Sequence, residues 1–172
     1  KDSITKNIVV RPNPVVDFTA PVVIGCRAPF TVNFQDISPY AVSWLWNFGD
    51  GGTSSLQNPT HQYNTTGQFT VTLTITDSKG CSNTISKSDF VRIIPPTIDI
   101  INAPAGGCVP FTFVPVASIN AIDGIASYLW DFGDGSTSTA PSPSHTFGSI
   151  GNYTISLTIT TSGGCTQSKI IT

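Results

Sequence analysis

The chain has 172 residues and a net charge of −2, and it lacks an apolar run of the roughly eighteen residues that a membrane-spanning helix needs. It also lacks the basic stripe that would bind nucleic acid, so neither nucleic acid nor a membrane is an expected partner of this segment. Every acidic residue is aspartate and methionine is absent, whereas Thr, Ser, Val, Ile, Gly and Pro dominate. This composition favours strands and tight turns and predicts an all-β protein.

The first segment of the chain matches a later one. Residues 4–12 (ITKNIVVRP) resemble residues 85–95 (ISKSDFVRIIP), which close the first of two internal repeats. We therefore interpret residues 1–12 as the last strand of a preceding repeat. The chain stops at residues 169–172, part-way through the equivalent strand of the second copy. A chain that begins and ends inside its own period is predicted to be a piece of a longer array.

Short segments with alternating apolar and polar side chains follow. The apolar positions of the first copy are Phe30, Val32 and Phe34, then Trp44, Trp46 and Phe48, and then Phe69, Val71, Leu73 and Ile75. Thr occupies the positions between the last four residues. A period of two with one apolar face and one polar face is typical of strands in an antiparallel sandwich.

The same pattern returns in the second half of the chain. Residues 46–81 align without a gap with residues 130–165, which lie 84 positions later. Repetition with a fixed period indicates two copies of one structural unit. We predict a first domain over residues 13–95 and a second over residues 96–172, with the last strand of the second domain truncated.

The four cysteines stand apart from one another, at Cys26, Cys81, Cys108 and Cys165. Zinc sites are usually built from C-x-x-C pairs, so this spacing favours disulfides in an oxidising, extracellular setting. Four cysteines allow three connectivities. The simplest pairs Cys26 with Cys81 and Cys108 with Cys165, which gives each domain one structural disulfide.

The segments WNFGDG (46–51) and WDFGDG (130–135) resemble the signature of the polycystic-kidney-disease (PKD) domain family. The supporting positions are Pro59, His61, Tyr63, Gly67 and Phe69, and then Pro143, His145, Phe147, Gly151 and Tyr153. Asn47 replaces the usual Asp of the family, and Phe147 replaces the usual Tyr. The resemblance implies two tandem immunoglobulin-like antiparallel β-sandwiches, used in extracellular proteins as spacers or binding modules. The flanking cysteines resemble those of repeats in giant bacterial surface adhesins.

Three residues of each copy are candidate motif residues: Trp46, Asp50 and His61, with their equivalents Trp130, Asp134 and His145. An aspartate in a Gly-Asp-Gly turn is predicted to accept backbone N–H bonds and to fix the turn after the Trp strand. One histidine per copy cannot make a metal site. A structural role for it, hydrogen-bonded near the tryptophan, is therefore expected.

Calcium is the alternative for the aspartates, because some members of the family bind it. Asp17, Asp50 and Asp77 could supply carboxylate oxygens in the first copy, but the second copy has no aspartate at the position of Asp77. Calcium takes about six to eight oxygen ligands, usually with several carboxylates close together. We therefore predict no cofactor, with calcium left as an open possibility.

No nucleophile, acid and base are brought together by the repeat, so no enzyme active site is expected. The leading hypothesis is a stalk or filament shaft of a large secreted or cell-surface adhesin that attaches to cells or surfaces. It rests on the repetition, the truncated ends and the stiff Pro95–Pro96 junction. The expected partners are neighbouring repeats, identical chains in a filament or bundle, and a protein or glycan bound elsewhere in the parent protein.

Two other functions compete with this hypothesis. The chain could be an accessory spacer or binding module of a secreted hydrolase, such as a protease or a polysaccharide-degrading enzyme. Direct binding of sugars or proteins by the repeats themselves would require a contiguous patch of exposed aromatic side chains. The alternation of aromatic with polar residues places most of these rings in the core instead.

Overall fold

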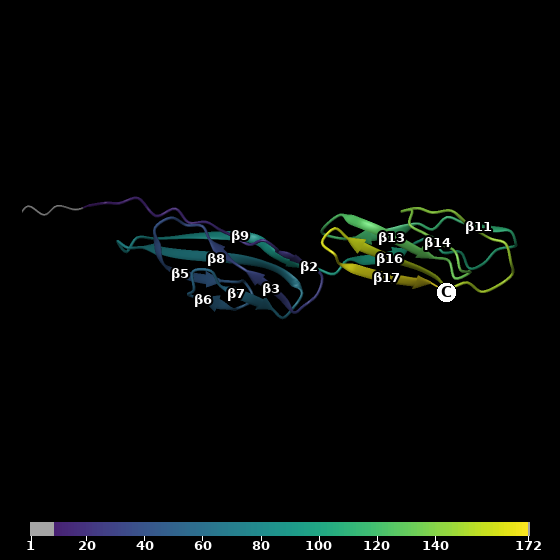
Figure 1. The fold of residues 1–172 in the computed structure, drawn as a ribbon, viewed down its shortest axis with the longest axis horizontal. Helices are drawn as coiled ribbons and strands as arrows, with labels where there is room; N and C mark the ends of the chain where they lie inside the picture. The colour runs from purple at the N-terminus through teal and green to yellow at the C-terminus, as the bar shows by residue number, and fades with distance from the viewer. Residues whose placement is uncertain (1–8, 172) are drawn as a thin grey trace, which may run out of the picture. The chain divides into compact units, whose positions relative to one another are not determined.

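The computed structural model describes residues 9–171. They form strands and connecting turns without a helix and divide into two compact units (Figure 1). Of the described residues, unit 1 contains 9–23 and 29–92, and unit 2 contains 24–28 and 93–171. The predicted all-β fold is confirmed. None of these residues lies in a helix long and apolar enough to cross a membrane.

Apart from β2, each strand of the first half has a counterpart in the second half. Up to residue 93 they are β1 (Phe18–Thr19), β2 (Ile24–Gly25), β3 (Phe30–Asn33), β4 (Gln35–Asp36), β5 (Ala41–Asn47), β6 (Thr53–Ser54), β7 (Thr60–Tyr63), β8 (Gly67–Asp77) and β9 (Ser82–Ile93). Beyond it they are β10 (Thr97–Ile100), β11 (Phe111–Phe113), β12 (Ala117–Asn120), β13 (Ile125–Asp131), β14 (Thr137–Ser138), β15 (His145–Phe147), β16 (Ile155–Thr161) and β17 (Thr166–Ile171). The strand predicted within residues 1–12 falls mainly on residues 1–8, outside the described part, and residues 9–12 form no strand.

Each unit is a two-layer sandwich. The larger sheet of unit 1 contains the order β9-β8-β5-β6, and the larger sheet of unit 2 repeats it as β17-β16-β13-β14. The second layer is built from short antiparallel pairs: β3 with β7 and β1 with β4, and then β11 with β15 and β10 with β12. The register is the same in both units, since Trp46 lies opposite Leu73 and Trp130 opposite Leu157. The predicted tandem immunoglobulin-like architecture is confirmed.

A tryptophan occupies the centre of each core. Trp46 and Trp130 are fully buried, and Trp46 packs edge-on against Phe18 of the opposite layer at a centroid distance of 5.2 Å. The inward positions of β8 and β16 are equally buried, namely Val71, Leu73 and Ile75 and then Leu157 and Ile159. Burying one such aliphatic side chain contributes roughly 1.5–3 kcal/mol, so these strands supply much of the hydrophobic stabilisation.

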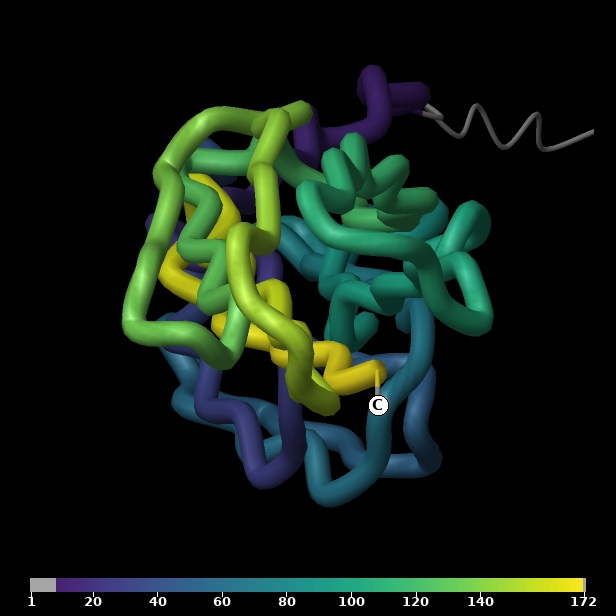
Figure 2. Tube along the Cα trace, turned by 90° about the vertical axis from the view of Figure 1, so that its right-hand side faces the viewer, coloured from purple at the N-terminus to yellow at the C-terminus, as the bar shows by residue number. Residues whose placement is uncertain are grey.

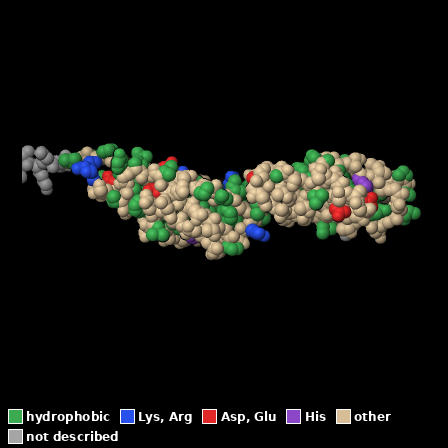
Figure 3. All heavy atoms as spheres, viewed as in Figure 1, with side chains coloured by type: hydrophobic (Ala, Val, Ile, Leu, Met, Phe, Trp, Pro, Cys, Tyr) green, Lys and Arg blue, Asp and Glu red, His purple; other side chains and the backbone are tan. Residues whose placement is uncertain are grey.

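The outward face of β8 and β9 is lined with hydroxyl groups that bind one another. Cross-strand Oγ–Oγ distances of 2.8 Å join Thr72 to Ser86, Thr74 to Thr84 and Thr76 to Ser82. Opposing Thr and Ser pairs of this kind stabilise a sheet surface without charge. Lys, Arg and Asp side chains are accordingly sparse on the face shown in Figure 3.

The predicted pairing of the cysteines is wrong. The structure joins Cys26 to Cys165, with Cα atoms 5.6 Å apart, and leaves Cys81 and Cys108 as free thiols. Residues 24–28 are part of unit 2, so this disulfide lies within that unit. By sequence, however, Cys26 belongs to the first repeat and Cys165 to the second.

Strand direction explains why Cys108 does not bond to Cys165. Cys108 lines a cavity with Tyr153, Ile155 and Ile171, beside the start of β16 and the end of β17. The strands β16 and β17 form a hairpin, drawn in yellow in Figure 2. Cys165 lies in the turn between them, at the opposite end of the hairpin. The seven residues of β16 span about 20 Å. A disulfide requires Cα atoms within about 7 Å, so the two thiols cannot meet.

The first copy has the same strand directions. Phe30, which begins β3, lies opposite Tyr63, and the Tyr63 ring packs 4.5 Å from that of Phe69 near the start of β8. Cys26 precedes β3, whereas Cys81 follows the far end of β8, a strand of eleven residues. The two cysteines of a repeat therefore belong to opposite ends of its long hairpin.

The two tryptophans differ in one hydrogen bond, and this difference predicts unequal effects of substitution. Trp46 Nε1 donates to the Leu56 carbonyl at 2.9 Å, whereas Trp130 Nε1 is buried without a partner among the described residues. Trp46→Phe removes a satisfied bond, so it should cost about 1 kcal/mol more than Trp130→Phe. Hydrogen-exchange mass spectrometry under denaturant would report on each unit through its own peptides. If both variants lost the same free energy of unfolding, the Trp46 Nε1 hydrogen bond would not contribute to stability.

Candidate functional site

The Gly-Asp-Gly turn of unit 1 is held by its own aspartate. Asp50 lies between β5 and β6, and its Oδ1 accepts the Gly52 N–H at 2.9 Å. Its Oδ2 lies 2.7 Å from Nε2 of His61, which is on β7 in the other layer. The predicted turn-fixing bond is therefore present. In addition, the carboxylate ties the turn to the opposite sheet.

His61 is fixed from both sides by aromatic rings. It stacks on Phe48, with centroids 4.1 Å apart and planes within 9°, and it meets Tyr63 edge-on at 4.7 Å. The Tyr63 hydroxyl in turn donates to the Phe48 carbonyl at 3.0 Å. The imidazole is thus packed between layers as well as bonded to Asp50, which leaves it little freedom to move during a reaction.

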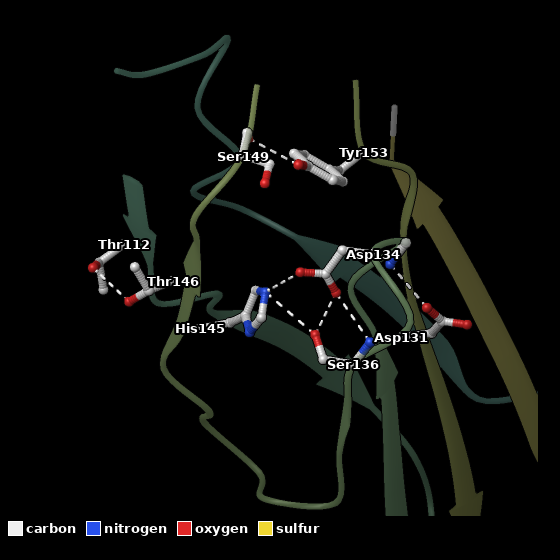
Figure 4. A network of polar contacts seen from close by, with 9 residues as sticks. Thr112, Asp131, Asp134, Ser136, His145, Thr146, Ser149 and Tyr153 are labelled. Carbon is white, nitrogen blue, oxygen red and sulfur yellow. Dashed lines mark hydrogen bonds and ion pairs between the residues drawn. The ribbon is translucent and has the colours of Figure 1, made fainter. Parts of the chain in front are cut away.

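Unit 2 repeats the site with small changes (Figure 4). Asp134 Oδ2 lies 2.8 Å from Nε2 of His145, and His145 stacks on Phe132 at 4.2 Å. Phe147 stands where unit 1 has Tyr63, so the bond from a hydroxyl to the turn carbonyl has no counterpart. Ser136 replaces Gly52, and its hydroxyl donates to Asp134.

Asn47 stands where the family usually has Asp, and this replacement does not change the geometry of the turn. Asn47 Oδ1 accepts the Gly49 N–H at 2.9 Å, and Asp131 Oδ1 accepts the Gly133 N–H at 2.8 Å. Only an acceptor oxygen is used at this position, and amide and carboxylate both supply one.

These contacts favour the ionised aspartates. Hydrogen bonds from the side chain and backbone of Ser136, together with His145, lower the pKa of Asp134 to about 2. Burial acts to raise the pKa of Asp50, but bonds from His61 and the Gly52 backbone outweigh it and the pKa is lowered. Burial, with a smaller contribution from the Asp50 charge, raises the pKa of the Tyr63 hydroxyl. At neutral pH the two aspartates are therefore ionised acceptors and the Tyr63 hydroxyl stays a protonated donor, so none of the three groups is poised as a general acid or base.

Asp134, Ser136 and His145 superficially form a hydrolytic trio. Ser136 Oγ, however, lies 3.3 Å from Nε2 of His145, the same nitrogen that contacts Asp134. A serine hydrolase needs the hydroxyl on one ring nitrogen and the carboxylate on the other, so that one nitrogen accepts the proton while the other is held. This arrangement cannot relay a proton, and unit 1 has glycine in place of the serine. The site positions a turn.

Each of the three aspartates considered for calcium already binds another group of the protein. Asp17 pairs with Lys87, Asp50 with His61, and Asp77 accepts the backbone N–H groups of Lys79 and Cys81. Within residues 9–171 no three His, Cys, Asp or Glu side chains come together as a metal site. The fold therefore does not bring Asp17, Asp50 and Asp77 together into one cluster.

Sequence reasoning missed an ion pair that both copies share. Lys87 Nζ lies 2.7 Å from Asp17 Oδ1, and Lys169 Nζ lies 3.1 Å from Asp99 Oδ1. Hydrogen bonds from these lysines lower the pKa of Asp17 and of Asp99. The signal was available, because Asp17/Asp99 and Lys87/Lys169 recur with the same spacing of 82 residues. Exposed pairs of this kind contribute little stability, because solvent screens the two charges.

Both halves of the chain match the same protein family. A sequence model of the PKD domain matches residues 9–93 and again residues 94–172. The two matches cover the two copies of the turn and both Asp–His pairs.

Curated relatives match over short segments. A microbial collagenase of Vibrio alginolyticus is 40% identical over 84 residues, which are 48% of this chain and 10% of the collagenase. Collagenase ColA of Bacillus cereus is 59% identical over 39 residues, which are 23% of this chain and 4% of the enzyme. The pre-pro-metalloprotease PrtV of Vibrio cholerae is 54% identical over 43 residues, 25% of this chain and 5% of that protein. The chain thus spans a tenth or less of each.

Two solved PKD domains each match about half of this chain. The PKD1 domain of the Vibrio cholerae metalloprotease PrtV shares 34% identity, covers 48% of this chain and 99% of its own, and gives a TM-score of 0.41. The PKD1 domain of Vibrio anguillarum Epp shares 32% identity, covers 48% and 96%, and gives a TM-score of 0.40.

The lowered pKa of Asp134 predicts a stability contribution that depends on pH. Because the folded pKa lies below the ordinary value of 3.8, the contribution is complete above pH 4 and is lost as the pH falls towards 2. Asp134→Asn should therefore unfold at a lower temperature than the parent chain at pH 6. The difference between the two unfolding temperatures should shrink between pH 4 and pH 2. Calorimetric melts across this range would test it. If this difference in unfolding temperature did not change with pH, the charge of the Asp134 carboxylate would not contribute to stability.

Two glycines of the unit 2 turn provide a matched pair for a second test. Gly133 and Gly135 both have positive φ, +77° and +92°, so alanine strains either position by roughly 1–2 kcal/mol. A Cβ on Gly133 would also lie 2.5 Å from the Thr154 carbonyl oxygen, whereas one on Gly135 would meet nothing within 4 Å. Gly133→Ala should therefore destabilise unit 2 by about 2 kcal/mol more than Gly135→Ala in denaturant unfolding. Equal destabilisation would mean that the turn does not press on the Thr154 backbone.

Proposed function

The chain belongs to the PKD domain family, and from this premise we propose that it is a non-catalytic spacer segment of a secreted hydrolase. The observation that carries the proposal is the use of the polar residues that the two copies share. Asp50, His61, Asp134 and His145 are all engaged in fastening a turn to the opposite sheet. A pair of rigid sandwiches is suited to hold other domains of a larger protein apart.

The identity of the relatives supports a hydrolase as the parent protein. The matches are a collagenase of Vibrio alginolyticus, a collagenase of Bacillus cereus and a metalloprotease of Vibrio cholerae. In each of them the matching segment is a small fraction of the length, which fits an accessory part beside a separate catalytic part. An extracellular location follows from this proposal.

The orientation of the aromatic rings supports a spacer over a binding surface. Trp46 and Trp130 are in the cores, and Trp44 Nε1 donates to Asp36 Oδ2 at 2.7 Å. Among the strongly exposed large apolar side chains of the described residues, Tyr40 is the single aromatic one. A sugar-stacking platform needs several such rings side by side.

The stalk of a surface adhesin is the second candidate. The observation in its favour is the repetition of one sandwich along the chain, since a shaft is built from copies of a single unit. The collagenase and metalloprotease relatives favour the hydrolase.

One experiment separates these functions. An antibody raised against the 172-residue chain would locate the parent protein in the medium and on the cell surface of the source organism, alongside zymograms containing gelatin or polysaccharide. We expect the reactive band to coincide with a cleared band, and the purified chain alone to clear nothing. A reactive cell-surface protein without hydrolytic activity, seen as long threads by electron microscopy, would establish the adhesin instead. Clearing by the chain alone would refute a non-catalytic role.

A further inference from the structure

The disulfide joins two cysteines that are not equivalent within the repeat. Cys26 corresponds to Cys108, and Cys165 corresponds to Cys81. The bond therefore links the first cysteine of one repeat to the second cysteine of another. Two cysteines remain unpaired: Cys108, which is the first cysteine of its repeat, and Cys81, which is the second cysteine of its repeat.

The turn that carries Cys81 has the conformation of the turn that carries the bonded Cys165. The Asp77 N–H donates to the Cys81 carbonyl at 2.9 Å, as the Thr161 N–H donates to the Cys165 carbonyl at 2.8 Å. The glycine before each cysteine also has nearly the same φ, +82° at Gly80 and +81° in the second turn. Cys81 is therefore presented by a backbone already shaped for the bond that Cys165 makes.

The surroundings of Cys108 leave room for such a turn. At the formed bond, a cavity of about 240 Å³ beside Cys26 is walled by Gly164, Thr166 and Gln167 from the turn that carries Cys165. Beside Cys108 there is a cavity of about 790 Å³, lined in part by Val109 and Phe111, and Cys108 itself is exposed. The cavity beside Cys108 is lined by residues 103–109 and 149–155, and no second cysteine of the described residues lines it.

We propose that Cys108 and Cys81 are complementary halves of one linkage site, in which the Cys108 loop of one chain receives the Asp77–Cys81 turn of a second copy of this chain. The contact is heterologous, because it joins different surfaces of the two copies. Repetition of such a contact produces an open linear assembly rather than a closed dimer. The proposal does not depend on the identity of the parent protein, since hydrolase spacers and adhesin shafts could both use it.

The linkage is an ordinary thiol–disulfide exchange with a small-molecule disulfide as the oxidant. The thiolate of Cys108 attacks oxidised glutathione, which forms a mixed disulfide and releases one molecule of reduced glutathione. The thiolate of Cys81 from the second copy then attacks the Cys108 sulfur and releases the other. Both protein thiols lose a proton and an electron, and the oxidant leaves as two thiols.

The test is oxidation of the full 172-residue chain in a glutathione buffer, followed by non-reducing electrophoresis and peptide mapping. We expect a ladder of linear oligomers that contain an intramolecular Cys26–Cys165 peptide and an intermolecular Cys81–Cys108 peptide. Cys81→Ser and Cys108→Ser should each abolish the ladder and leave monomers that retain Cys26–Cys165. An equimolar mixture of the two variants should restore a heterodimer, because each then supplies the half that the other lacks.

Retention of the Cys26–Cys165 peptide in both variants shows that they are folded, so loss of the ladder cannot be attributed to unfolding. Three results would overturn the proposal. One is Cys26–Cys81 and Cys108–Cys165 pairing in the parent monomer. Another is a Cys81–Cys108 bond within a monomer. The third is homodimers from the single variants in the same yield as the heterodimer from the mixture, which would indicate unselective oxidation.

Discussion

The packing of one tryptophan between two sheets is the contact on which each repeat depends. A sandwich of about 80 residues buries a limited apolar surface, and a single large ring at its centre therefore carries a large share of the stabilisation. Trp46 and Trp130 sit at the same register opposite Leu73 and Leu157. Because the ring spans the space between layers, it fixes their separation. The turn that follows the tryptophan strand is consequently held close to the opposite layer.

The Asp–His pair is best understood as a consequence of that closeness. Once the turn lies beside β7 or β15, a carboxylate on the turn can reach an imidazole on the strand and complete the backbone bonds of the turn at the same time. The histidine stacks on the aromatic residue two positions after the tryptophan, which extends the core to the edge of the sandwich. Residues that would attract attention as catalytic in a cleft thus act here as a fastening between layers.

Strand direction links this architecture to the proposed function. In each repeat β3 and β8, or β11 and β16, begin at the same end of the sandwich, so a cysteine before the first strand and one after the second are separated by the length of the hairpin. A repeat built in this way stabilises itself by packing and keeps its cysteines for other partners. This division suits modules that serve as spacers, whether their parent is a hydrolase or a surface fibre.

The sequence by itself determined the all-β class, the two copies, the inward faces of the main strands and the turn-fixing role of Asp50 and Asp134. Each of these follows from local information, because side-chain alternation, glycine-rich turns and a fixed period are properties of neighbouring residues. Only the tertiary structure decided which residues far apart in the chain meet. The bond from Asp50 to His61, the pair formed by Asp17 and Lys87, and above all the disulfide between Cys26 and Cys165 depend on the direction in which facing strands run. The spacing of cysteines along a chain does not encode that direction, so the simplest pairing by sequence was the one that the hairpin length forbids.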